Sequence, residues 1–455
     1  MPFLTRRAVF QQAWPIIAGQ ALVPLVGLVD VAVIGRVGAA ADLGGVALGA
    51  AIVNFVFWTF GFLRMGVTGI TAQAHGAGDG AEVAATLMRS LLLGAMLGLA
   101  ILLLAPVIVP LSLRVMAAPP GASRAAHAFV AARLMGAPAA LSFYAVNGWL
   151  LGLGRTRLAL GVQAVMNGVN IALDLLFVGG LGLGAGGVGL GTALADWSAL
   201  LGGLVAVRLV LGPGWRRQLR AIGAARLRDR PALRRLVGVN LDIMVRTLAL
   251  LLLFTWFTRA SAGLGTVPLA ANHVLMQFVS VSAFVLDGFA FTAEARAGAA
   301  IGAGSRADLL RAIRLTGEFS LGGGLLFAGL ILALGHPAIA LFTRDPATRA
   351  LAHAMLPFCA AVPLIGAPAW LLDGIFIGAT AGRALRNASI AATALYLATD
   401  FALRPWGDDG IWIALLASYV YRAGALGIAL PRLLHRVPAS PSPVALCQAT
   451  SVRPE

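Results

Sequence analysis

The chain is poor in charged side chains. Only 11% of its 455 residues are Asp, Glu, Lys or Arg, and lysine is absent, so all 34 basic side chains are arginine. A soluble globular domain carries about 25% charged residues. This shortage, together with a hydrophobic fraction of 59%, excludes a soluble protein and predicts a chain that lies in lipid.

Cysteine, histidine and clustered acids are also scarce. The two cysteines, Cys359 and Cys447, are far apart in sequence, and the six histidines are scattered. Their spacing suits neither a disulfide framework nor a metal site. An aspartate-rich DDxxD cluster is absent as well, which argues against a prenyltransferase. We therefore expect a protein that is not an enzyme and needs no cofactor.

Long apolar runs, in contrast, are abundant. A transmembrane helix needs about 20 mostly apolar residues, and twelve such stretches predict an all-α integral membrane fold with both termini on one side. The first run is too long for a signal peptide and has no Ala-x-Ala exit. The twelve stretches lie near 10–35, 44–72, 86–112, 126–153, 156–181, 184–211, 235–258, 266–294, 312–335, 350–378, 385–403 and 410–431.

Arginine gathers on one side of this twelve-span map. The side that holds the termini carries Arg6, Arg7 and the run from Arg216 to Arg235, whereas the opposite side carries few, such as Arg36 and Arg259. By the positive-inside rule, both termini lie in the cytoplasm. A basic cytoplasmic loop is expected on this ground alone, so the net charge of +16 does not predict nucleic-acid binding.

A polar stretch divides the chain into two halves. We expect an N-terminal lobe of six helices at 1–211, an amphipathic cytoplasmic linker at 212–234, and a C-terminal lobe of six helices at 235–436. The remaining tail, residues 437–455, is rich in Pro and Ser. That composition is typical of a disordered segment.

The two halves are related by an internal repeat. Residues 72–79 align with 298–305 at a displacement of 226 residues, 147–152 align with 373–378 at the same displacement, and Asp174 falls on Asp400. Because each half has an even number of spans, the repeat is parallel, with its axis along the membrane normal. The simplest arrangement is a pair of pseudo-symmetric bundles.

Acids inside the spans are the candidates for function, because a charge at the bilayer centre costs about 2.5–3.5 kcal/mol on insertion scales. Asp30 lies in the first span, and Asn170 and Asp174 share one helix face four residues apart in the fifth. Asn147 and Thr192 can add two oxygens if their helices face the same interior. A carboxylate among hard oxygen ligands suits H⁺ or Na⁺, and no other metal is predicted.

A second set of polar positions indicates a C-terminal site or a substrate cavity. Its members are Asp373, Arg64, Met65, Arg246 and Asp287. This set has a structural alternative, because ion pairs with the two arginines would explain the acids and ordinary packing would explain the methionine.

Several of these residues stand in segments that carry a family resemblance. The segments are LVPLVGLVDVAVIGRVG at 22–38, FGFLRMGVTGITAQAHGAGD at 60–79, NGVNIALDLLF at 167–177 and LLDGIFIGATAGRALRNA at 371–388. In them the sequence resembles the multidrug and toxic compound extrusion (MATE) transporters, specifically their DinF-like branch. The resemblance covers the chain from about Trp14 to Arg432.

The resemblance implies a V-shaped pair of six-helix lobes that exports organic compounds, often cationic, against inward H⁺ or Na⁺. The family's N-lobe cation site matches Asp30, Asn147, Asn170, Asp174 and Thr192. The C-lobe acid of some Na⁺-coupled branches matches Asp373. Their partner glutamate on helix 7 has no match here, where Arg246 lies nearby, and this departure argues against a C-lobe Na⁺ site.

These observations predict a monomeric, cation-coupled antiporter of the cytoplasmic membrane that exports small organic molecules by alternating access. Two alternatives stay open. A flippase of lipid-linked precursors shares the broader fold and would need a cationic cavity, for which Arg64 and Arg246 are the intramembrane candidates. A membrane-embedded transferase is the alternative from another class.

Overall fold

The computed structural model is entirely helical over the residues that it describes, which are 4–37, 40–116 and 120–438. Within these ranges the side chains at 23–26, 28–32, 35–37, 40–41, 120 and 220–221 lie outside the description. Lipid offers no hydrogen bonds to the backbone, so each apolar segment satisfies its own peptide groups as a helix. The tail at 439–455, predicted to be disordered, is outside the described residues.

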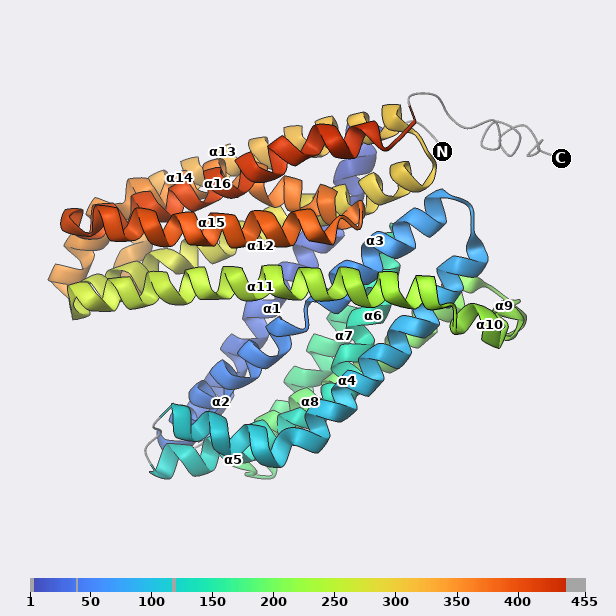
Figure 1. Cartoon of the computed structure of the whole chain (residues 1–455). Coiled ribbons are helices and arrows are strands. Elements are labelled where there is room, and N and C mark those ends of the chain that lie inside the picture. Colours follow the sequence, from blue (N-terminus) through green and yellow to red (C-terminus); the bar gives the residue numbers. More distant parts are fainter. Residues whose placement is uncertain (1–3, 38–39, 117–119, 439–455) are drawn as a thin grey trace. The chain divides into compact units, whose positions relative to one another are not determined.

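Ten of the helices belong to the first half of the chain and the linker (Figure 1). They are α1 (Arg6–Val37), α2 (Ala40–Thr59), α3 (Phe62–Gly76), α4 (Gly80–Val115), α5 (Pro120–Leu134), α6 (Ala137–Gly152), α7 (Thr156–Asp174), α8 (Gly184–Leu211), α9 (Trp215–Ala221) and α10 (Ala224–Leu227). A π-helical turn, η1 (Leu175–Gly180), continues α7.

The second half contains six long helices (Figure 1). They are α11 (Arg230–Leu264), α12 (Thr266–Gly302), α13 (Arg306–Phe342), α14 (Pro346–Gly378), α15 (Gly382–Leu403) and α16 (Asp408–His435), with a short 3₁₀ turn, η2 (Arg404–Trp406), between the last two.

Each of the twelve predicted spans corresponds to one helix or one pair of helices. Among the described residues, nine helices are long and apolar enough to cross a membrane, and α5 with α6, bent by 52°, makes a tenth span. Helix α1 and helix α15 complete the twelve. The second span, predicted at 44–72, corresponds to one candidate span at Asp42–Gly76, in which α3 follows α2, and α11 begins at Arg230, five residues earlier than predicted.

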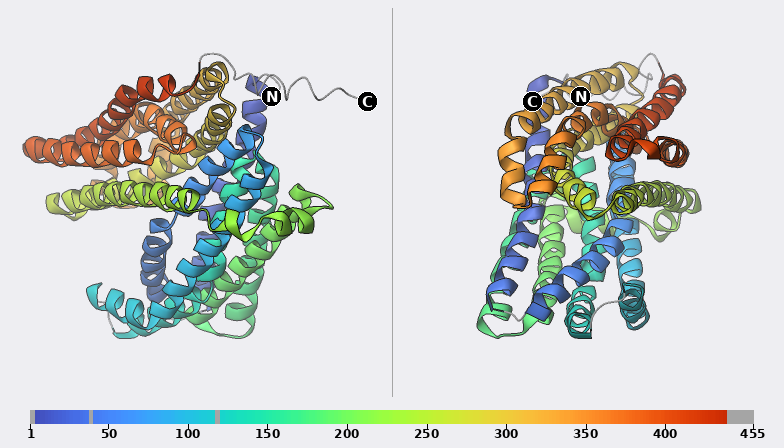
Figure 2. Two further views of the ribbon diagram at one scale, coloured as in Figure 1. Left: turned by 45° about the vertical axis from the view of Figure 1, so that its right-hand side comes forward. Right: turned by 90° about the vertical axis from the view of Figure 1, so that its left-hand side faces the viewer.

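The chain forms two compact units. One, the C-terminal unit, contains residues 1–17, 72–78 and 237–455, and the other, the N-terminal unit, contains 18–71 and 79–236. Helices α12 to α16 pack side by side in the C-terminal unit, and α4, α6 and α8 pack together in the N-terminal unit (Figures 1 and 2). Two short segments of the first half thus group with the second half, and the lobe boundaries drawn from the sequence stay a prediction.

Glycine contacts within the units recur at the displacement of the sequence repeat. In the N-terminal unit a Cβ on Gly148 would lie 2.4 Å from the carbonyl oxygen of Arg64, and in the C-terminal unit a Cβ on Gly374 would lie 2.3 Å from that of Ala290. Gly374 and Ala290 are the 226-residue counterparts of Gly148 and Arg64. In each unit, therefore, an equivalent pair of helices packs closely at a glycine. Small residues allow helix backbones to approach closely in lipid.

One glycine contact joins the two copies of the repeated motif to each other. Within the C-terminal unit, a Cβ on Gly76 would lie 2.0 Å from the carbonyl oxygen of Ala299, and a Cβ on Gly302 would lie 2.0 Å from that of Gln73. The contact is reciprocal, because Gln73 and Ala299 are counterparts, as are Gly76 and Gly302. Equivalent residues of the two copies of the motif thus pack against each other within this unit.

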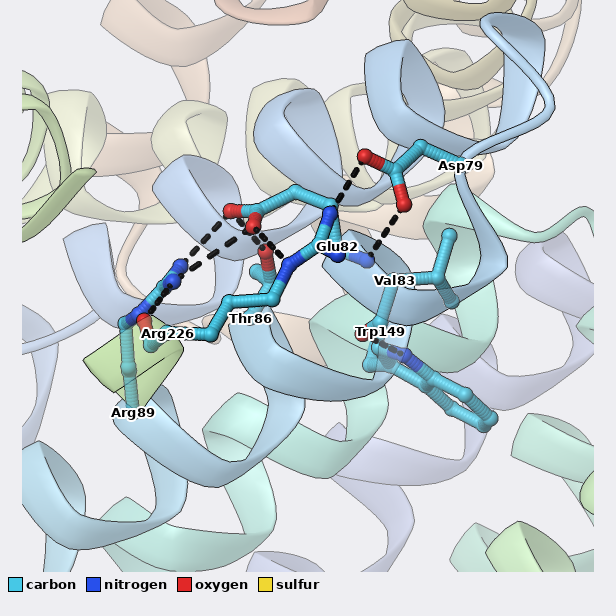
Figure 3. Close-up of polar contacts among 7 residues, drawn as sticks. All are labelled: Asp79, Glu82, Val83, Thr86, Arg89, Trp149 and Arg226. Atoms are coloured by element: carbon cyan, nitrogen blue, oxygen red, sulfur yellow. Dashed lines mark hydrogen bonds and ion pairs between the residues drawn. The ribbon is translucent and has the colours of Figure 1, made fainter. Parts of the chain in front are cut away.

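The linker helices α9 and α10 pack against α4. Figure 3 shows the polar contacts of Arg226, from α10, at the start of α4. Arg226 donates to the Asp79 carboxylate at 2.5 Å, Arg89 donates to Glu82 at 2.6 Å, and Arg89 also donates to the carbonyl oxygen of Arg226 at 2.5 Å. Ile222 packs below them against the alanines of α4. The segment predicted as an amphipathic cytoplasmic linker thus packs against α4 within the N-terminal unit.

Arg226→Gln is expected to loosen this linker without unfolding the protein. The arginine is 40% exposed at its side chain, and partly exposed ion pairs are worth about 1 kcal/mol or less each. Trypsin should therefore cut the linker after Arg216 or Arg217 about fivefold faster than in wild type. Limited proteolysis in detergent measures this rate, and Arg228→Gln is the control. Equal cleavage rates would show that the ion pair does not hold the linker.

Candidate functional site

Polar side chains line one face of α7 in the N-terminal unit. Gln163, Asn167, Asn170 and Asp174 follow one another at spacings of four, three and four residues, which places them on one side of a helix. Gln163 donates from Nε2 to the Asn167 side-chain oxygen at 3.2 Å. The last three are buried, with exposed fractions of 6%, 2% and 0%. The face therefore becomes more enclosed toward Asp174.

The Asp174 carboxylate sits against a glycine of α8. A Cβ on Gly191 would lie 2.5 Å from Asp174 Oδ1, so the carboxylate occupies the space that any larger residue at 191 would fill. The backbone changes at the same place, because α7 ends at Asp174 and passes into the π-helical turn η1. Such turns are rare and are frequent at functional sites.

Asn170 connects this face to α8. Its Nδ2 donates to Thr192 Oγ1 at 3.1 Å, and Thr192 Oγ1 donates in turn to the carbonyl oxygen of Val188 at 2.9 Å. The Asn170 Oδ1 atom is buried and accepts no hydrogen bond from the described residues. A buried acceptor oxygen thus lies one helical turn from a buried carboxylate.

The structure brings together three of the five residues predicted for the cation site. Asn170 and Asp174 share the face of α7, and Thr192 meets them from α8, next to Gly191. Asn147 is half-buried on α6, which packs against α8. Asp30 lies on α1, but its side chain is outside the described residues.

The second predicted set is divided between the two units. Arg64 and Met65 lie on α3 in the N-terminal unit, where Arg64 is within electrostatic range of Tyr144. Arg246 and Asp373 lie in the C-terminal unit and form a buried ion pair. Asp287, on α12, is in the same unit as this pair.

Sequence reasoning missed two residues that complete these sites. Gly191 has no signal of its own, because the segment around it is rich in glycine and only the structure shows which glycine meets a carboxylate. Arg422, on α16, was visible only as a charge that interrupts the twelfth span. The structure places its Nε 3.8 Å from Asp373 Oδ2.

Comparison with known proteins gives a consistent result. The MatE family model matches residues 15–176 and 243–401. The chain is 38% identical over 431 residues to the DNA damage-inducible protein F of Escherichia coli (strain K12), covering 94% of this chain and 92% of that protein. It is 29% identical over 468 residues to a probable multidrug resistance protein NorM of Pseudomonas aeruginosa, covering 97% and 93% respectively.

Solved structures show the same fold. A crystal structure of MATE in the bent conformation superposes with a TM-score of 0.83 at 19% identity, covering 98% of this chain and 97% of that one. An outward-facing multidrug resistance MATE transporter of the MOP superfamily superposes with a TM-score of 0.82 at 20% identity, covering 95% and 96%. These likenesses confirm the predicted fold of twelve transmembrane helices in two six-helix lobes. The chain belongs to the MatE family and is a multi-pass membrane transporter rather than an enzyme.

Proposed function

We propose that the protein is an antiporter that exports organic compounds, cations in particular, in exchange for inward H⁺ or Na⁺. It would act in the cytoplasmic membrane as a monomer, with both termini in the cytoplasm and with the lobes 1–211 and 235–436 alternating in access. One observation carries the coupling part of this proposal. The carboxylate of Asp174 is wholly buried one helical turn from Asn170, whose buried Oδ1 accepts no hydrogen bond from the described residues and whose Nδ2 donates to Thr192 Oγ1.

The chemistry of this site suits a small cation. A carboxylate buried in the protein interior gains free energy when a proton or a metal cation neutralises it. Amide and hydroxyl oxygens are hard ligands of the kind that alkali and alkaline-earth ions take. Asp30 and Asn147 are proposed as the further members of the site. The coupling ion is thus held by fixed oxygens of α7 and α8, while its charge is balanced by Asp174.

The membrane potential can supply energy to such an exchange. Each elementary charge that moves inward through 100 mV releases about 2.3 kcal/mol. Loading Asp174 removes a buried negative charge, which changes the relative free energy of the states that bury it to different extents. Binding of the ion and release of the exported compound are in this way linked, because both shift the same equilibrium between the conformational states of the transporter.

Asp174→Asn is expected to abolish gradient-driven export, because the amide has nearly the shape of the carboxylate but no charge to balance. Efflux of ethidium from cells that express wild type, Asp30→Asn and Asp174→Asn measures this, with the proton and sodium gradients collapsed separately. Wild-type efflux should stop when one of the two gradients is removed. Each substitution should lower the efflux at least tenfold.

Asp229→Asn, an exposed acid of the linker, is the matched control and should export like wild type. Membrane levels of all variants are compared on immunoblots. Wild-type efflux by Asp174→Asn would exclude this carboxylate as the coupling group. Efflux no greater than that of empty vector for wild type, at normal expression, would favour the flippase of lipid-linked precursors instead.

A further inference from the structure

The C-terminal unit encloses a cluster of three charged side chains from three helices. Arg246 on α11 donates from Nη2 to Asp373 Oδ2 on α14, and Arg422 Nε on α16 lies 3.8 Å from the same oxygen. All three side chains are enclosed, with exposed fractions of 9%, 5% and 6%. Over the described ranges, no other carboxylate lies within ion-pair distance of either arginine.

This cluster carries one more positive charge than negative charge. Donors without a partner also outnumber acceptors without one. Nε and Nη2 of Arg422 and Nε of Arg246 are buried and have no acceptor among the residues that the structure describes, whereas the cluster's one buried acceptor without a donor is Asp373 Oδ1. A buried charge without a counter-charge is costly, and guanidinium nitrogens that lack acceptors add to this cost. The arrangement is therefore incomplete with the protein's own groups.

Arg422 is the arginine available to a second anion. Arg246 already makes a direct hydrogen bond to Asp373, whereas the 3.8 Å contact of Arg422 is longer than a hydrogen bond. A second anion can therefore form hydrogen bonds with Arg422 without breaking the hydrogen bond between Arg246 and Asp373. The planar guanidinium presents two parallel donors, which match the two oxygens of a carboxylate.

An aromatic surface adjoins these donors. The Arg422 guanidinium carbon lies 5.4 Å from the centroid of the Tyr419 ring, and that ring lies 5.3 Å from the ring of Trp370. Tyr419 precedes Arg422 by three residues on α16, and Trp370 precedes Asp373 by three residues on α14. The two aromatic rings are thus one helical turn from the charged cluster, on the same two helices.

We propose that Arg422, positioned by the Arg246–Asp373 pair, binds the carboxylate of a solute that has a flat apolar body, with Tyr419 and Trp370 as neighbours of that body. The inference rests on the proposed export function and extends its substrates from cations to carboxylate-bearing organic ions, zwitterions included. The N-terminal half does not repeat this set of charges, because the repeat counterparts of Asp373 and Arg422 are Asn147 and Asp196.

Thermal unfolding of the full chain in detergent, titrated with 1-naphthoate, tests this binding without any ion gradient. Wild type should be stabilised in a saturable way, since a ligand that binds only the folded state raises the melting temperature. The uncharged 1-naphthamide should not do so, which separates specific binding from partition into detergent. Inorganic phosphate at matched ionic strength tests the competing anion.

Arg422→Gln should weaken naphthoate binding at least tenfold, and Arg422→Lys, which keeps the charge but loses the planar fork, should weaken it less. The ligand-free melting temperature of Arg422→Gln should equal or exceed that of wild type, because the substitution removes an incompletely paired buried charge. A purely structural role for Arg422 would instead lower it. Arg314→Gln, an exposed arginine of the same unit, should bind like wild type.

The proposal is wrong if naphthoate and naphthamide stabilise the protein equally, if phosphate binds and naphthoate does not, or if Arg422→Gln binds naphthoate with wild-type affinity. None of these outcomes depends on transport. If wild type shows no gradient-driven ethidium efflux but binds naphthoate, the antiporter proposal is overturned and the carboxylate site is retained.

Discussion

Gly302→Val is expected to prevent normal folding of the C-terminal unit. A Cβ at this position would lie 2.0 Å from the carbonyl oxygen of Gln73, and the reciprocal contact at Gly76 is equally short. The opposing atoms belong to helix backbone, so no side chain can turn aside to make room. Overpacked cores usually lose about 1–3 kcal/mol, and an obstacle in the backbone on both sides of a reciprocal contact should exceed that range.

Fluorescence-detected size exclusion of a fusion to a fluorescent protein measures the amount of folded transporter. We expect Gly302→Val to give at least tenfold less monodisperse protein, and Gly302→Ala to give a smaller loss of the same sign. Gly329→Val on α13 is the control, because a Cβ there meets nothing within 4 Å. A normal yield of Gly302→Val would show that the repeated motifs do not pack this closely.

Gly191→Ala is expected to remove export while leaving the protein folded. Its new Cβ would lie 2.5 Å from Asp174 Oδ1 but 3.5 Å from the backbone nitrogen of Asp174. The end of a side chain can rotate, so the fold survives, but the carboxylate must leave its position against residue 191. A displacement of about 1 Å at a functional group commonly costs about 10²-fold in rate, so efflux should fall at least tenfold.

Gradient-driven ethidium efflux and the melting temperature in detergent, measured on the same variant, separate these two effects. The melting temperature should stay within a few degrees of wild type. Gly186→Ala on the same helix is the matched control, because its Cβ would make only an ordinary contact of 3.7 Å with Ala128. Wild-type efflux by Gly191→Ala would mean that the position of the Asp174 carboxylate is not critical for coupling.

The two halves have equivalent glycine contacts between helices but differ in their buried charged side chains. Asp400, the repeat counterpart of Asp174, accepts hydrogen bonds from Trp256 Nε1 at 2.9 Å and from Arg404 Nη2 at 2.8 Å. Asp373, the counterpart of Asn147, is neutralised by Arg246. Asp400 and Asp373 are thus each paired with an arginine of the C-terminal unit.

The sequence by itself determined the twelve spans and the repeat. Bilayer thickness requires about 20 apolar residues for each span, and this requirement can be read along the chain without knowledge of the neighbours. The displacement of 226 residues, found by counting, recurs in the glycine contacts of Gly148 and Gly374. The place of Asp174 inside the fifth span, four residues from Asn170 on one helix face, was also read from the sequence.

The tertiary structure alone decided which side chains meet. Thr192 and Asn170 are 22 residues apart in sequence, and Arg246 and Asp373 are 127 apart. Their meeting depends on how each helix is rotated about its axis and where it crosses its neighbour. These quantities follow from packing of small residues against backbone, for which a sequence rich in Gly and Ala offers many equivalent choices. The pairing of Arg422 with an already bound aspartate, and the docking of the linker on α4, were hidden for the same reason.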